Sequence, residues 1–113
     1  PNIAEIAVAD SIMGTWKTRG LRGSTLEDMI NTKKRFNKTD GILAYHAYQS
    51  FKENEVTPEL AHEIGIKLAE EMWGDKFEVV VSTHLNTNHI HNHFVINSVS
   101  FIDGKKYYDS KSK

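Results

Sequence analysis

The clearest periodic pattern lies between residues 57 and 74. Apolar side chains recur there at every fourth position, which is typical of one face of a helix: Leu60, Ile64, Leu68 and Met72. Thr57 is a favourable N-cap, Pro58 suits the first helical position, and Gly74 supplies a stop. Gly65 inside this helix costs about 1 kcal/mol relative to Ala, so we expect the helix to pack closely against a sheet at that point.

Three other segments alternate between apolar and polar residues or are rich in residues that favour β-structure, and they therefore predict strands. They are Ile42–Phe51, Phe77–Thr83 and Ile90–Phe101. The last two are joined by the polar stretch HLNTNH, which we expect to be a loop, and Asp103-Gly104 predicts a turn. Alternation in the first strand places His46 and Tyr48 on one face. Tyr45 falls on the other face and is expected in the core.

The first third of the chain is less regular. Ile3–Met13 fits a short helix or a strand equally well, and the glycine-containing, basic stretch Trp16–Ser24 indicates a loop or arm. Ser24 or Thr25 is expected to cap a short helix that runs through Ile30. The order of elements predicts an α+β fold with a mainly antiparallel sheet covered by helices.

Length and composition favour one domain spanning residues 1–113. The chain has 113 residues, 39% hydrophobic and 26% charged, with no cysteine. These values exclude collagen, coiled coil and wholesale disorder, and the missing cysteines exclude disulfides and thiolate metal sites. No apolar run is long enough for a membrane helix and no secretion signal is present at the start, so we expect a cytoplasmic protein without membrane contact.

Charge is unevenly distributed although the net charge is only -1. Residues 16–38 carry seven basic side chains against two acidic ones, whereas residues 53–78 carry eight acidic against two basic. Local potential governs binding to a polyanion, so a basic face for nucleic acid is one interpretation, and two solvated surface segments are the other. The candidate nucleic-acid-binding residues are Lys17, Arg19, Arg22, Lys33, Lys34, Arg35, Lys105 and Lys106.

Four of the six histidines fall within ten residues, in HLNTNHIHNH. If a strand begins at Ile90, His91 and His93 point to one face, and His84 returns beside them from the preceding strand. Three imidazoles with open positions suit a catalytic metal ion. His89 ranks as a fourth candidate at the loop edge, and Asn86 as a residue that orients an imidazole. Packed histidines without a metal are the alternative, and a structural zinc site, which favours cysteine, fits less well.

At this motif the sequence resembles the relaxases, the mobilization nucleases of the HUH endonuclease class. The resemblance rests on HLNTNHIHNHFVINSVSFIDGKKYY together with the upstream stretch from KKRFNKTDG to VVVSTH, and it covers Thr32–Tyr108. Residues 1–31 are a poorly matched arm, and residues 32–113 form the matched core.

The resemblance implies a relaxase-like fold, complete or incomplete, that binds single-stranded DNA at a transfer origin and works with other mobilization proteins. It implies that His84, His91 and His93 hold a divalent ion, Mg or Mn with Zn as the alternative. In the family a tyrosine attacks the phosphodiester, which gives a 5'-phosphotyrosine link and a free 3'-hydroxyl.

Two departures from the family pattern matter. Asn86 stands where an acid is usual, and residues 1–30 contain no tyrosine, although the family's nucleophile lies near the N-terminus. The chain is therefore interpreted as a fragment that lacks the nucleophile, or as an enzyme that borrows one. Tyr48, on the strand face of His46, is the candidate within the chain, and an ordinary strand aromatic is its alternative role.

Two other function classes remain open from the residues. One is a metal-dependent hydrolase that uses metal-activated water, with Glu78 or His46 as the base. The other is a non-catalytic metal-binding module. A truncated sheet would leave an exposed edge, so pairing into a homodimer is a further expectation.

Overall fold

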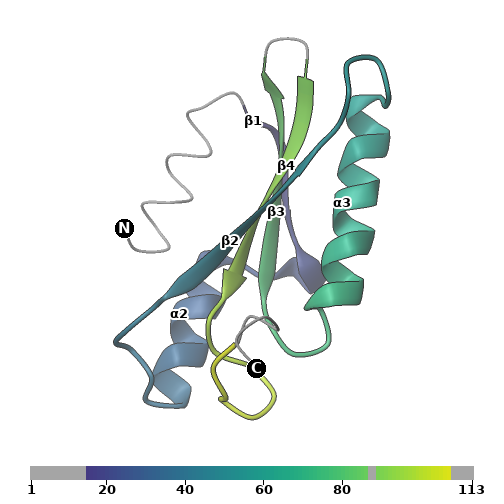
Figure 1. Cartoon of the computed structure of the whole chain (residues 1–113). Coiled ribbons are helices and arrows are strands. Elements are labelled where there is room, and N and C mark those ends of the chain that lie inside the picture. Colours follow the sequence, from purple (N-terminus) through teal and green to yellow (C-terminus); the bar gives the residue numbers. More distant parts are fainter. Residues whose placement is uncertain (1–14, 87–88, 108–113) are drawn as a thin grey trace.

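The computed structural model describes residues 15–86 and 89–107, and Figure 1 shows their arrangement. The elements in chain order are β1 (Thr15–Gly20), the 3-10 turn η1 (Leu21–Gly23), α2 (Leu26–Arg35), β2 (Ala44–Ser50), α3 (Pro58–Met72), β3 (Val79–Asn86) and β4 (His89–Asn97). The predicted α+β class is confirmed. The segment Ile3–Met13 and Tyr108 lie outside the described residues.

The four strands form one antiparallel sheet in the order β1-β3-β4-β2. The hairpin of β3 and β4 occupies the centre, and β1 and β2 are the edges. In this hairpin His84 pairs with His91, and Ser82 pairs with His93. Side chains alternate between the two faces of a strand, so this register places all three histidines on the same face.

Helix α3 covers the other face of the sheet, as Figure 1 shows. Its N-terminus is capped as predicted, because the hydroxyl of Thr57 accepts a hydrogen bond from the Leu60 backbone amide at 3.2 Å. Its buried side packs on the central strands and forms the core, whose larger members are Ile66, Trp73, Phe77, Val79, Val81, Phe94 and Ile96.

The close approach expected at Gly65 is present. A Cβ atom added there would lie 2.5 Å from Nδ2 of Asn92 and 3.2 Å from Cγ1 of Val81. Because both contacts are closer than ordinary van der Waals distance, only glycine lets α3 settle onto β3 and β4 at this point.

Helix α2 packs on one end of the histidine-bearing face. Thr25 and Asp28 form a capping box at its start. The carbonyl of Met29 accepts a hydrogen bond from Asn97 Nδ2 at 3.1 Å, and the Thr32 hydroxyl donates to Glu78 at 2.5 Å. Since Asn97 and Glu78 alternate with core residues of β4 and β3, they reach the side away from α3.

Two predicted loops are largely strand. The stretch Trp16–Ser24 contains most of β1, which pairs with β3 along its length. In HLNTNH, β3 continues to Asn86 and β4 begins at His89, so the hairpin connection is much shorter than predicted. Their polar composition gives little β signal, and pairing with a neighbour decides the outcome. No helix in the described ranges has the length and apolar character needed to cross a membrane.

Candidate histidine site

Three imidazoles gather on the face of the sheet that α3 leaves free. The ring centre of His84 lies 4.9 Å from that of His91 and 4.7 Å from that of His93, and the last two are 5.6 Å apart. His84 is only 2% exposed, whereas His91 and His93 are half-buried. The hairpin register therefore brings together the three residues that the sequence singled out.

The ring spacing fits a shared ion, but the ring orientation has to change. Imidazoles that bind one ion through nitrogens at ~2.1 Å have ring centres about 5 Å apart. The rings of His84 and His91 are stacked, with an interplanar angle of 25°. As the side chains stand, no group of three or more His, Asp or Glu residues in the described ranges is arranged to hold a metal ion. Metal binding would require the rings to rotate so that their nitrogens converge.

A buried polar network fixes the strands beneath the histidines. Asn92, between His91 and His93, is 0% exposed and points towards α3. Its Nδ2 donates to the Ala61 carbonyl at 2.8 Å, and its Oδ1 accepts from the Thr83 hydroxyl at 2.7 Å. Such satisfied buried groups specify one register, because a slipped strand would leave them without partners. Sequence reasoning missed this network, whose members are ordinary polar residues on the α3 side.

The network extends to His62 on α3. Its Nδ1 lies 2.7 Å from the Thr83 hydroxyl, and burial lowers the pKa of His62 below its ordinary value. The Thr83 hydroxyl already donates to Asn92, so His62 Nδ1 is the donor of this bond. His62 belongs to α3, and Thr83 directly precedes His84 on β3. This hydrogen bond therefore ties α3 to the strand that carries His84.

Tyr48 and His46 lie on the same face as the histidine cluster. Tyr48 pairs with His93 across β2 and β4, and their rings form an edge-to-face contact with centres 4.4 Å apart. The Tyr48 side chain is 64% exposed. The ring centre of His46 lies 6.2 Å from those of both Tyr48 and His93. The structure therefore places Tyr48 at the rim of the cluster and His46 one step behind it.

The other two tyrosines in the described ranges are partly buried and pack against the core. The rings of Tyr45 and Tyr107 are 5.0 Å apart, and the Tyr107 hydroxyl accepts a hydrogen bond from Trp73 Nε1 at 3.3 Å. Tyr45 occupies the opposite face from Tyr48, as the alternation predicts. Neither side chain is placed to reach the histidine cluster.

Asn86 and His89 form the last pair of the hairpin. The His89 side chain is exposed, and the Asn86 side chain lies outside the described part of the structure. Glu78, the candidate base of the hydrolase alternative, is misplaced for that role. It lies just before β3 and six residues before His84, a separation of roughly 20 Å, and its carboxylate accepts hydrogen bonds from Thr32 and Asn97.

The lysines and arginines that are candidates for DNA binding do not gather at one place. Lys17 and Arg19 of β1 pair with Thr83 and Val81, so they project to the α3 side. Arg19 also lies 3.9 Å from Glu63 of α3. Lys33 is 4% exposed, and burial lowers its pKa to about 8. Its ammonium group is therefore turned into the protein and does not contribute to a basic surface.

The remaining basic side chains lie at the end of the sheet that α2 covers and in the segment after β4. Lys34 and Lys105 are exposed, and Lys106 donates to the Asp40 carbonyl at 3.0 Å. Arg22 and Arg35 line a cavity beside α2. The basic side chains thus reach the histidine-bearing face only at its α2 end.

Comparison with known proteins places this geometry in a family context. Residues 16–113 match the family described as relaxase, MobA/VirD2-like, nuclease domain. "Protein rlx" of Staphylococcus aureus is 45% identical over 80 residues, which is 71% of this chain and 24% of that protein. "Group II intron-interrupted relaxase LtrB" of Lactococcus lactis subsp. cremoris is 36% identical over 107 residues, 88% of this chain and 19% of that protein. The chain thus spans about a quarter or less of these relatives. No solved structure matches it significantly.

Proposed function

Because the chain belongs to the MobA/VirD2-like relaxase family, we propose that it is the histidine-bearing part of a DNA-nicking mobilization relaxase. Its substrate is single-stranded DNA at a transfer origin, and the reaction transfers a phosphodiester to a tyrosine. The observation that carries the proposal is the gathering of His84, His91 and His93 on the two central strands. The buried network beneath them supports it, because it fixes the register that this gathering requires.

The three histidines are proposed to hold a divalent ion. Nucleases of this family are generally metal-dependent, and such an ion supplies charge stabilisation at a scissile phosphate. The chain's own contribution is to bring three imidazoles within reach, one from β3 and two from β4. Imidazole nitrogen is a better donor for transition metals than for Mg²⁺, so Mn²⁺ and Zn²⁺ belong beside Mg²⁺ in the test.

Tyr48 is the proposed nucleophile if this chain cuts by itself. Its hydroxyl-bearing ring is exposed and lies against His93. Attack of the Tyr48 oxygen on phosphorus would form a 5'-phosphotyrosine bond and release a 3'-oxygen that takes up a proton. His46, on the same strand face, is the candidate group to accept the proton that leaves Tyr48. Otherwise another segment supplies the nucleophile.

Calorimetry tests the metal site. Titration of the chain with Mn²⁺, Mg²⁺ and Zn²⁺ is expected to show uptake of one ion, and His91→Ala should abolish it. His89→Ala tests the fourth candidate ligand, because it removes an exposed imidazole two residues away on the same strand. Uptake that survives in His91→Ala would overturn the proposed set of three ligands, and uptake that is lost equally in His89→Ala would add His89 to the set.

A second experiment tests the chemistry. Labelled origin oligonucleotides are incubated with the chain and the bound metal, and covalent adducts are sought by denaturing gel. An adduct in the wild type that is absent in Tyr48→Phe supports the nucleophile. A cut product without a protein link, formed equally by Tyr48→Phe, favours the hydrolase alternative. Binding without any cut confines the chain to a DNA-binding part of the relaxase.

The sheet edges are proposed as contact sites for protein partners. β1 and β2 are the outer strands of the sheet that the described residues form, and outer strands are the usual place where a further chain adds to a sheet. A second copy of the chain or another mobilization protein would pair there. Sedimentation at rising protein concentration tests self-pairing, and a concentration-independent monomer would exclude it.

A further inference from the structure

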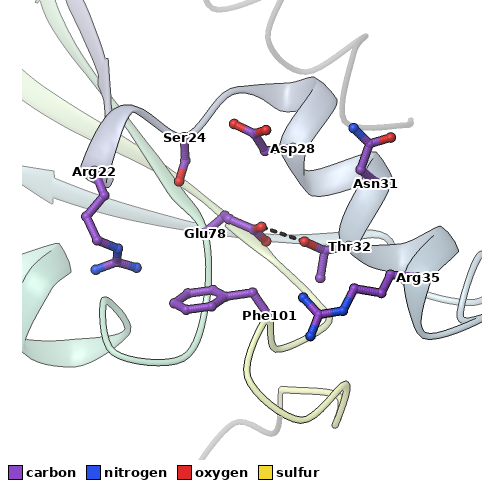
Figure 2. Close-up of a pocket in the computed structure, with 8 residues that line it drawn as sticks. All are labelled: Arg22, Ser24, Asp28, Asn31, Thr32, Arg35, Glu78 and Phe101. Carbon is purple, nitrogen blue, oxygen red and sulfur yellow. Dashed lines mark hydrogen bonds between the residues drawn. The ribbon is translucent and has the colours of Figure 1, made fainter.

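A cavity of about 380 Å³ lies on the histidine-bearing face at the α2 end. It is bounded by η1, α2, the start of β3 and the segment after β4, as Figure 2 shows. Glu78 in its wall is six residues from His84 along the strand, a separation of roughly 20 Å. The cavity is therefore distinct from the histidine cluster, although both are reached from the same side of the sheet.

Two arginines enter this cavity from different elements. Figure 2 shows Arg22 coming from η1 and Arg35 from the last turn of α2, with Phe101 between them in the view. The Arg22 guanidinium lies 5.0 Å from the ring centre of Phe101. Neither arginine forms an ion pair with a carboxylate of the described residues, although Asp28 and Glu78 line the same cavity. Their charge is therefore available to a ligand.

The carboxylates of the cavity wall are already engaged. Asp28 accepts a hydrogen bond from the Thr25 backbone amide at 2.8 Å in the capping box. Glu78 is buried, accepts from Thr32 at 2.5 Å and from Asn97 at 2.8 Å, and interacts electrostatically with the buried ammonium of Lys33. These bonds fix the wall. The two guanidinium groups balance Asp28 and Glu78 in formal charge, and the ammonium of Lys33 behind Glu78 makes the surroundings of the cavity positive by one charge.

We propose that this cavity binds one nucleotide of the single-stranded DNA, with the arginines on the phosphate and the base stacked at Phe101. Guanidinium groups suit phosphate oxygens, and a half-buried aromatic ring suits a base. The Arg22 guanidinium already lies over the Phe101 ring, so a base would add to an existing stack, whereas an acidic peptide would use the arginines alone. The inference rests on the proposed function and deepens it. The strand would run from the histidines towards α2, a span of about six nucleotides at a rise of ~3.4 Å and fewer if extended.

Fluorescence anisotropy with labelled single-stranded oligonucleotides tests the cavity. Arg22→Gln and Arg35→Gln remove one charge each from exposed side chains, so the fold should persist, which thermal melting verifies. Each variant should bind about tenfold more weakly than the wild type, because hydrogen bonds to charged groups are lost. The slope of log affinity against log salt should become less steep by about 0.7 for each phosphate contact removed. Lys67→Gln is the matched control, since it removes one exposed charge from α3 on the other side of the sheet.

Phe101→Leu separates stacking from charge. It should weaken binding at least about fivefold with an unmodified strand, and it should have much less effect with a strand whose bases are replaced by abasic sites. Its salt slope should stay that of the wild type. Equal losses with both strands would overturn the stacking part of the proposal.

The outcomes distinguish this inference from the proposed function. If the wild-type chain binds no single-stranded DNA even at low salt, the proposed function itself fails. If the wild type binds but both arginine variants behave like Lys67→Gln, only the cavity proposal is overturned. Binding of poly-glutamate that depends on Arg22 and Arg35, with unchanged DNA affinity, would assign the cavity to an acidic protein partner and would also overturn it.

Discussion

Substitution of Gly65 by Ala probes how tightly α3 must approach the histidine strands. The new Cβ atom would lie 2.5 Å from Nδ2 and 2.9 Å from Cγ of Asn92. Asn92 cannot simply turn away, because its amide is held by Ala61, Gln49 and Thr83. The clash therefore has to be relieved by moving α3 or by breaking these bonds.

The change that Gly65→Ala makes to the free energy of unfolding is the sum of opposing contributions. Ala gains about 1 kcal/mol over Gly in a helix interior. Overpacking costs about 1–3 kcal/mol, and leaving buried amide groups without partners costs about 1–3 kcal/mol more. We expect Gly65→Ala to destabilise the protein by about 3 kcal/mol, read as a lower urea midpoint at an unchanged denaturant slope.

A double-mutant cycle supplies the decisive control. In an Asn92→Ala background the two closest contacts disappear, and the next nearest atom is Cγ1 of Val81 at 3.2 Å. There Gly65→Ala should stabilise the protein by about 0.5–1 kcal/mol through helix propensity. The reasoning is refuted if Gly65→Ala raises the stability of the wild type, or if it has the same effect in both backgrounds.

Three further predictions concern the supporting structure. Burial lowers the pKa of Lys33 to about 8, so the unfolded chain holds the proton longer, and stability should rise between pH 8 and about 10.5, by up to about 3 kcal/mol. Urea melts of Lys33→Met should lack this rise, and an identical pH profile would contradict it. Burial also lowers the pKa of His62, so stability should fall as the pH drops below about 6.5. His62→Gln should flatten that fall, and an unchanged slope would count against it. Thr57→Ala removes the α3 cap and should cost about 1 kcal/mol in urea melts, whereas Glu59→Ala, in the same turn, keeps the cap and serves as the comparison.

The sequence predicted α3 well because its signals are local. The four-residue spacing, the Thr57 cap and the Gly74 stop all lie within the segment itself. Even the cost of Gly65 pointed to close packing, although the sequence did not identify Asn92 as the neighbour. The histidine cluster was also accessible from sequence, since spacing by two along a strand fixes the face of His91 and His93.

Non-local contacts explain what the sequence did not reveal. The edge strand β1 carries mostly exposed, polar side chains, and it becomes a strand through pairing with β3, 60 or more positions later. Lys33 looked like part of a basic surface, but it is buried because Asn97 and Ser98, far along the chain, receive its ammonium group. Pairings of such sequence separation leave no trace in local periodicity.

The pairing of His84 with His91 makes the site depend on whether an odd or an even number of residues separates them. Deleting one residue of β4 ahead of His91 would turn His91 and His93 towards α3 and bring Asn92 out on the face that now carries the histidines. Deleting two residues would keep His91 and His93 on the same face of the sheet and would only shift their rings along the strand. Natural length changes in this hairpin should therefore come in pairs.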